Sequence, residues 1–215
     1  MTKNPVLSYN WPKVAYNLQL NMGVELDYLT GGIGLESSII TLYHGSIFDF
    51  DKIDITRGKP YKDFGAGFYT SKAREHAVDL ALRNLKIEER RIKLHHTDTQ
   101  SRAWLYEYEF DLSNLYDLRV MEFPFANADW VKFVVLNRTN KIPQHDYDIV
   151  MGATANDQTL LAAQAYLSGL YGTIDDERTI QTFLQIIEPY RLPAQFYFGT
   201  QQAADLLDFK GRSML

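Results

Sequence analysis

The sequence predicts an α+β fold. Some segments show the period-two pattern of strands and others the 3.6-residue pattern of helices, and the two kinds follow one another without strict alternation. We expect about five or six strands and about five helices. The 215 residues suffice for one ordinary domain, residues 39–215, preceded by an appendage, residues 1–38.

The composition is that of a soluble globular protein. Hydrophobic residues make up 46% of the chain and charged residues 23%, which excludes a disordered or fibrous class. The net charge of -5 does not indicate a basic surface for binding bulk nucleic acid. The absence of cysteine excludes disulfides, thiolate nucleophiles and cysteine zinc sites. No segment has the length and apolarity of a membrane span or signal peptide. We therefore expect a cytoplasmic protein without membrane contacts, a secreted effector with another signal being the alternative.

Residues 1–38 carry weak patterns. Pro12 could begin a helix with Val14, Leu18 and Met22 on one side, before a glycine-rich stretch. We interpret this segment as a helical appendage packed on the main domain. A partner-binding arm is the alternative.

The main domain opens with two short predicted strands. Ile39–Tyr43 is apolar and β-branched and ends in His44-Gly45-Ser46, whereas Phe64–Thr70 contains two glycines. Residues 49–63 between them mix charges with glycine and proline, as surface loops do. Glycine beside an imidazole or a tyrosine at a strand end lets a ligand approach the backbone, so the pair predicts a ligand cleft.

A helix is expected next. Ser71 would cap it, Glu75 lies in its first turn, and small or apolar residues recur on one face. That inner face comprises Ala73, Ala77, Leu80, Ala81 and Leu85, and a solvated outer face comprises Arg74, Lys86, Glu88, Glu89, Arg90 and Arg91.

Further strands and helices follow a polar turn at His95–Arg102. In Trp104–Phe110, aromatic residues alternate with others, which predicts a strand whose aromatic face lies in the core. The remaining expected elements are a strand at Leu118–Met121, a buried helix at Trp130–Asn137, a strand at Tyr147–Met151, a helix at 158–168, a helix after a capping box of Thr173 and Asp176, a strand at Ala194–Phe198 and a short helix from the cap Thr200 through Leu207.

Three motifs in order carry a family resemblance: His44-Gly45-Ser46, Phe64-Gly65-Ala66-Gly67-Phe68-Tyr69, and Gln195 in the last strong strand. They resemble the ADP-ribosyltransferase superfamily of the diphtheria-toxin and poly(ADP-ribose) polymerase type, in which a Glu holds the third position. The chain looks most similar to an uncharacterised bacterial group with Gln there. The resemblance covers roughly Ile39 to Phe209 and implies a split core of two mostly antiparallel β-sheets with flanking helices.

The resemblance implies NAD as the substrate, with no metal. His44 would bind the ribose hydroxyls, the Gly45 backbone would pair with the carboxamide, and Tyr69 would stack on the nicotinamide ring. Ser46 would contact the adenosine end and Arg57 the diphosphate. The implied catalytic residues are His44, Tyr69 and Gln195, and the implied NAD-binding residues are His44, Gly45, Ser46, Arg57, Gly67 and Tyr69.

Gln195 can accept a hydrogen bond from a ribose hydroxyl, but it carries no charge and cannot act as a base. Chain-building activity is therefore not expected, and mono-ADP-ribosylation, NAD hydrolysis and NAD binding alone stay open. The acceptor could be a protein, a nucleic acid or water. A toxin of a toxin–antitoxin pair, with a cognate antitoxin or inhibitor protein as partner, fits the same chemistry.

Other polar residues have plainer interpretations. Asp148 and Asp157 could face the cleft and supply the missing carboxylate, although Asp at a helix start is commonly a cap. We expect His76 and His145 to be structural or solvated, and we expect no metal at His95-His96.

Overall fold

The computed structural model describes residues 38–96, 100–155, 157–174, 176–187 and 193–215. All of them belong to one compact unit, Ile33–Leu215. The appendage expected at residues 1–38 lies outside the described residues, apart from Ser38.

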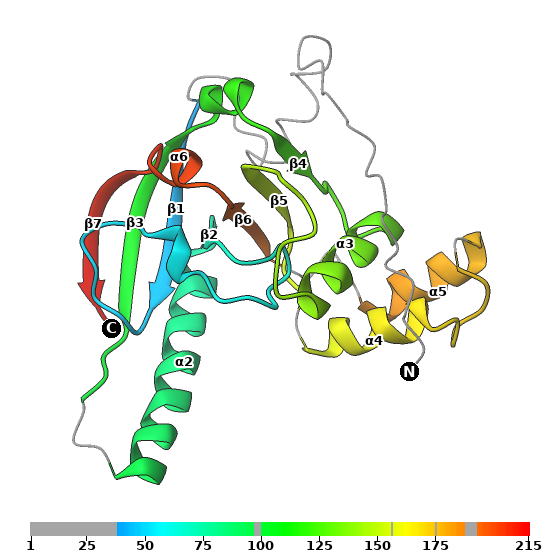
Figure 1. Cartoon of the computed structure of the whole chain (residues 1–215), viewed down its shortest axis with the longest axis horizontal. Helices are drawn as coiled ribbons and strands as arrows, with labels where there is room; N and C mark the ends of the chain where they lie inside the picture. Colours follow the sequence, from blue (N-terminus) through cyan, green and yellow to red (C-terminus); the bar gives the residue numbers. More distant parts are fainter. Residues whose placement is uncertain (1–37, 97–99, 156, 175, 188–192) are drawn as a thin grey trace. The chain divides into compact units, whose positions relative to one another are not determined.

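Seven strands form one mixed sheet, in the order β4-β5-β6-β2-β1-β3-β7 (Figure 1). All neighbouring pairs are antiparallel except β4 and β5, which are parallel. This confirms the α+β class, whereas a second sheet is not found among the described residues. The strands are β1 (Ile39–Ser46), β2 (Phe68–Ser71), β3 (Trp104–Asp111), β4 (Val120–Glu122), β5 (Ile149–Ala153), β6 (Ala194–Phe198) and β7 (Asp208–Met214).

The ladder between β1 and β2 is the shortest in the sheet. These strands share only the pair Tyr43–Ser71, whereas β1 and β3 pair along their whole length. We call the junction of β1 and β2 the seam. It separates the strand group β4-β5-β6-β2 from the group β1-β3-β7, so each group is held together internally by more ladder pairs than join the two.

Helices and short 3₁₀ turns connect the strands. Among the described helices, none has the length and apolarity needed to cross a membrane. They are the 3₁₀ turns η1 (Ile55–Arg57) and η2 (Leu112–Asp117) and the helices α2 (Arg74–His95), α3 (Ala128–Thr139), α4 (Asp157–Leu167), α5 (Glu177–Ile187) and α6 (Gln201–Ala204).

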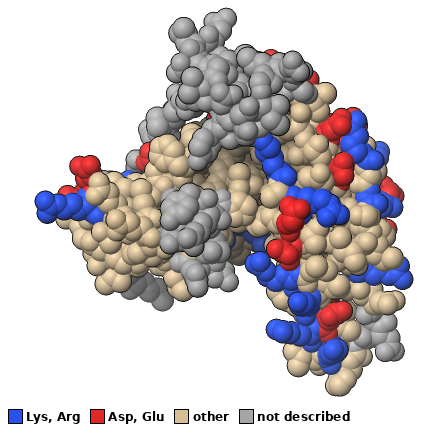
Figure 2. Space-filling view, turned by 180° about the vertical axis from the view of Figure 1, so that it is seen from behind, with Lys and Arg blue, Asp and Glu red and all other residues tan. Residues whose placement is uncertain are grey.

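Helix α2 packs against β1 at Gly45. A Cβ atom on Gly45 would lie 1.9 Å from the carbonyl oxygen of Ala77, so only glycine lets the helix approach this closely. Ala77 and Ala81 are buried, as their helical spacing predicted. The charged outer face is largely exposed, and Figure 2 shows Lys and Arg interleaved with Asp and Glu along this helix.

The core is rich in aromatic side chains. Tyr106, Tyr108 and Phe110 on β3 are each at most 3% exposed, which confirms the prediction of an aromatic core row for these three residues. Trp104, at the start of the strand, is partly exposed. Trp130 and Phe133 on α3 are fully buried, which confirms the buried helix. The burial of these large side chains removes apolar area from water and so stabilises the domain.

Two local predictions are corrected by backbone geometry. The strand predicted at Phe64–Thr70 begins only at Phe68, because Gly65 adopts a positive φ of 94° and turns the chain. Ser71 is not the N-cap of α2, although its hydroxyl does accept a hydrogen bond from the Ala73 amide.

The structure of the C-terminal half departs from the prediction at three further points. Asp176, not Thr173, caps α5, because its carboxylate accepts hydrogen bonds from the amides of Arg178 and Thr179. Thr200 does cap α6, but this helix ends at Ala204 instead of Leu207. Strand β7 follows and was not predicted.

Candidate functional site

A pocket lies between α2 and strands β1, β2 and β6. Its wall brings together Gly45, Tyr69 and Gln195, one residue from each predicted motif. Its volume is about 30 Å³, room for a few water molecules, so a larger ligand requires side chains in the wall to move. The other lining residues are Tyr43, Thr70, Ser71, His76, Ala77 and Leu80.

Strand register explains why these residues meet. Tyr69 faces Tyr197 across β2 and β6, and Ser71 faces Gln195. Residues opposite each other in an antiparallel pair project on the same face, so Tyr69 and Gln195 share the face that α2 covers.

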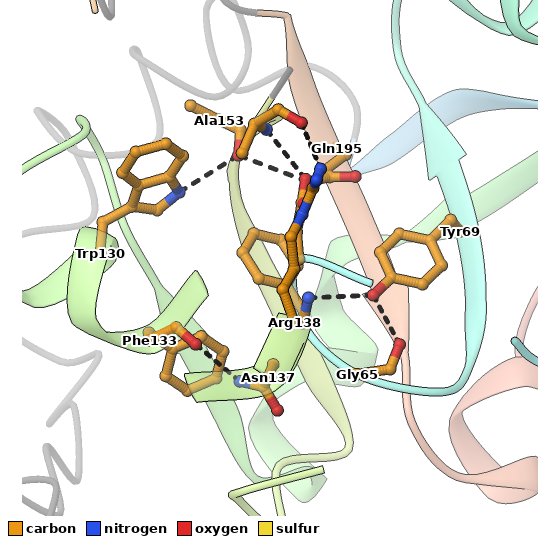
Figure 3. A network of polar contacts seen from close by, with 11 residues as sticks. Gly65, Tyr69, Trp130, Phe133, Asn137, Arg138, Ala153 and Gln195 are labelled. Atoms are coloured by element: carbon orange, nitrogen blue, oxygen red, sulfur yellow. Dashed lines mark hydrogen bonds and ion pairs between the residues drawn. The ribbon is translucent and has the colours of Figure 1, made fainter. Parts of the chain in front are cut away.

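Tyr69 is held rigidly in the wall. Its hydroxyl donates to the Gly65 carbonyl at 2.7 Å and accepts from the Phe64 amide at 3.0 Å (Figure 3). Burial, reinforced by the charge of Asp63, raises the pKa of Tyr69 well above its ordinary value. The phenol is therefore neutral at physiological pH, and its ring has a fixed orientation.

Gln195 is fixed by a buried carboxylate. Its Nε2 donates to Asp63 Oδ2 at 2.7 Å, and Asp63 is only 4% exposed. Asp63 also accepts from Arg138 Nε at 2.5 Å and from the Ala155 amide at 2.8 Å. Because a carboxylate only accepts hydrogen bonds, the amide nitrogen of Gln195 must face it. Gln195 Oε1 has no hydrogen-bond partner among the described residues.

Helix α3 positions the Arg138 side of this network. Trp130 Nε1 donates to the Ala153 carbonyl at 3.2 Å, which ties α3 to β5 (Figure 3). Arg138 follows in the last turn of the helix, and its guanidinium also donates to the Ala155 carbonyl. The ion pair with Asp63 is largely buried, so removing either charge would leave the other uncompensated.

The network accounts for the amide at position 195. A Glu carboxyl there would lie within hydrogen-bond distance of Asp63, and the contact could form only if one of the two groups kept a proton, which costs free energy at neutral pH. Gln supplies the donor that Asp63 requires. Asp63 lies at the junction of the predicted loop and the second motif, where the motif gave it no role of its own, and no role was predicted for Arg138.

His44 does not line the pocket. Along β1 it alternates with Gly45, so its side chain projects from the opposite face of the sheet, where it stacks on Phe68 with ring centroids 4.3 Å apart. Its Nδ1 donates to the Tyr69 carbonyl at 2.7 Å across the seam.

The environment of His44 keeps it neutral. Burial lowers its pKa to about 4, although the hydrogen bond to the Tyr69 carbonyl acts in the opposite direction. With the proton on Nδ1, the neutral ring presents Nε2 as a hydrogen-bond acceptor.

Three other predicted NAD-binding residues also lie outside the pocket wall. The Ser46 hydroxyl accepts from the Phe48 amide at 3.0 Å. Arg57 is exposed and stacks over the Phe48 ring at 5.7 Å. Gly67 faces Tyr197, where a Cβ atom would lie 2.3 Å from the ring, so glycine is needed there for packing.

Of the two candidate replacement carboxylates, Asp148 does not line the pocket. Asp148 accepts hydrogen bonds from the Arg119 side chain at 3.0 Å, and the Asp157 side chain lies outside the described residues. His145 is structural, as expected, because its Nε2 donates to the Phe64 carbonyl at 2.7 Å. His76, expected to be structural or solvated, lines the pocket instead.

The part of the chain that the structure describes holds no group of three or more histidine or acidic side chains placed to bind a metal ion. A family model described as a protein of unknown function, DUF3990, matches residues 40–209. No curated protein and no solved structure matches the chain. The matched range includes all three motifs and the Asp63–Arg138 pair.

Proposed function

The chain belongs to the DUF3990 family, and we propose that it is an NAD-dependent mono-ADP-ribosyltransferase. It would cleave the glycosidic bond to nicotinamide and transfer ADP-ribose to an acceptor. In this proposal the strand groups on either side of the seam correspond to the two sheets of an ADP-ribosyltransferase-like core.

One observation carries the proposal. The pocket gathers one residue from each of three motifs that are far apart in the sequence, Gly45, Tyr69 and Gln195. A glycine backbone, a rigid aromatic ring and a fixed amide oxygen are the groups that a carboxamide-bearing aromatic ring with an attached ribose requires.

The pocket would act mainly by orientation. Loss of nicotinamide leaves an oxocarbenium-like cation on the ribose, which an electron-rich oxygen stabilises. Gln195 Oε1 is such an oxygen, and the hydrogen bond from Nε2 to Asp63 keeps it from rotating away. A neutral amide stabilises the cation less than a carboxylate would, so we expect slow turnover.

His44 would contribute from the seam. Its Nε2 can accept a hydrogen bond from a ribose hydroxyl as the dinucleotide crosses the end of β1. Since Ser46 follows on the same face as His44 and Arg57 lies in the next loop, these residues are the proposed contacts for the rest of the dinucleotide.

The test is NAD turnover with a blocked pocket. Purified protein is incubated with adenylate-labelled NAD and cell lysate, and nicotinamide release and label transfer are measured. Leu80→Trp places an indole in the pocket wall, and Leu82→Trp places one on an exposed position of the same helix. We expect turnover in the wild type and in Leu82→Trp but not in Leu80→Trp. A wild-type protein that does not cleave NAD would refute the proposal, whether or not NAD binds.

A catalytically silent NAD-binding or interaction module is the second candidate, favoured by the neutral amide at Gln195 and the small volume of the pocket. Calorimetry distinguishes the two, because the module binds NAD without releasing nicotinamide. A toxin role would be a use of the same chemistry, and growth inhibition on expression that is lost in Leu80→Trp would support it.

A further inference from the structure

An acceptor hydroxyl must lose a proton when its oxygen attacks the ribose carbon. Gln195 cannot take that proton, because an amide is not a base at neutral pH. Asp63 is 4% exposed, and its carboxylate already accepts from Gln195, Arg138 and the Ala155 amide. If the acceptor is a neutral hydroxyl, a protein base that assists the loss of this proton must be another group in the pocket.

His76 is the one imidazole among the described residues of the pocket wall. It lies in the first turn of α2, directly before Ala77, whose carbonyl contacts Gly45. Its side chain is half-buried, and no described residue forms a hydrogen bond with it. Its ring therefore borders both the pocket and solvent, as a group that accepts and then releases a proton must.

Burial and the neighbouring charges together favour the neutral form of His76. Burial is the largest effect and lowers its pKa, and Arg83 on the same helix acts in the same direction. The negative charges of Asp79 on α2 and of Asp63 act in the opposite direction and raise the pKa. Among the residues that β1, β2 and β6 contribute to the wall, only Tyr43 and Tyr69 carry titratable side chains, and none carries a charged carboxylate, ammonium or guanidinium group. An uncharged imidazole has a lone pair to accept a proton.

We infer that His76 is the general base that deprotonates a neutral O–H acceptor, water or an alcohol, during ADP-ribose transfer; this rests on the proposed function. The bond between the ribose C1′ and the nicotinamide nitrogen breaks, and its electron pair leaves with nicotinamide. The acceptor oxygen forms the new bond to C1′, and its proton moves to the free ring nitrogen of His76. The imidazolium then releases the proton to solvent.

The inference is tested by nicotinamide release from NAD, with water as the acceptor and methanol as a second O–H probe. The variants are His76→Gln and His76→Ala, with His95→Gln as a matched control at the exposed end of α2. We expect kcat to fall about 100-fold, the low end for a general base, because an oxocarbenium-like transition state requires little from the nucleophile. KM should change by less than about twofold.

The pH profile separates a base from a structural residue. In the wild type, kcat falls at acid pH as His76 becomes protonated, and this limb disappears in His76→Gln. Added imidazole should partly restore His76→Ala. Calorimetric NAD binding and melting temperature are measured for each variant.

Each possible outcome either supports or overturns the assignment of His76 as the base. If the wild type releases no nicotinamide, whether or not it binds NAD, the proposed function fails and the base with it. If the wild type turns over and His76→Gln keeps its rate and pH profile, the base alone is overturned. A loss of rate matched by an equal loss of NAD binding or of folded protein also overturns it, because His76 would then hold substrate or structure.

Discussion

Gln195→Glu should destabilise the protein at neutral pH and much less at acid pH. The substitution replaces the donor that faces Asp63 Oδ2 at 2.7 Å with an acceptor. The new carboxyl can restore the hydrogen bond only by keeping its proton. The cost is therefore at most the free energy of protonating a glutamate at the pH of the experiment.

That ceiling follows from an ordinary glutamate pKa near 4.3. Protonating such a group costs about 4 kcal/mol at pH 7 and about 1 kcal/mol at pH 5, since each pKa unit corresponds to about 1.4 kcal/mol. Adding Asp63→Asn moves the amide to the other side of the contact and conserves the total charge beside Arg138. We expect the double variant to recover about 2 kcal/mol of the loss at pH 7.

The assay is urea unfolding of the wild type, both single variants and the double variant at pH 7 and pH 5. Gln144→Glu is the control, because Gln144 is exposed and its Nε2 donates to the Ile142 carbonyl at 2.8 Å, away from any carboxylate, so the cost should be below about 1 kcal/mol at both pH values. An equal loss at both pH values, or no recovery in the double variant, would show that Asp63 does not determine the residue at 195.

Three further outcomes concern stability. Gly45→Ala should lose about 3 kcal/mol or more by denaturant unfolding, because the added Cβ would lie 1.9 Å from the Ala77 carbonyl oxygen, whereas Gly211→Ala, with nothing within 4 Å, should be close to neutral. The His44 pKa is lowered to about 4, so the unfolded state binds the extra proton as the pH falls. Wild-type stability should therefore fall by about 2.5 kcal/mol between pH 6.5 and pH 4 relative to His44→Gln, as thermal melts at each pH would measure. Thr70→Val should raise the melting temperature by a few degrees, because the Thr70 hydroxyl is buried without a hydrogen-bond partner among the described residues.

The fold was predictable where burial alternates along one segment. The aromatic period of β3 and the small inner face of α2 are local patterns, and both are present in the structure. Strand β7 has no such pattern, because it lies at the sheet edge and most of its residues, including Phe209, are exposed. Its pairing with β3 depends on tertiary contacts that no local period records.

The motifs predicted which residues meet in the candidate pocket, but they did not predict the residues that hold those side chains in place. Gly45, Tyr69 and Gln195 meet as their motifs suggested, whereas the partner of Asp63, Arg138, lies 75 residues away and has no local signal. The position of His76, in contrast, did have a local signal in the sequence. It precedes Leu80 by four residues, and a helix places such residues on the same face, which here is the face turned to the sheet.

The single β1–β2 pair at Tyr43 and Ser71 also bears on how the domain opens. Separating the two strand groups there breaks few ladder hydrogen bonds, so this opening requires less free energy than global unfolding. Amide hydrogens flanking the seam should therefore exchange with solvent faster than those between β1 and β3, and a bound ligand that spans the seam should slow them. Hydrogen exchange at this shortest ladder would then show whether a ligand is bound across the seam.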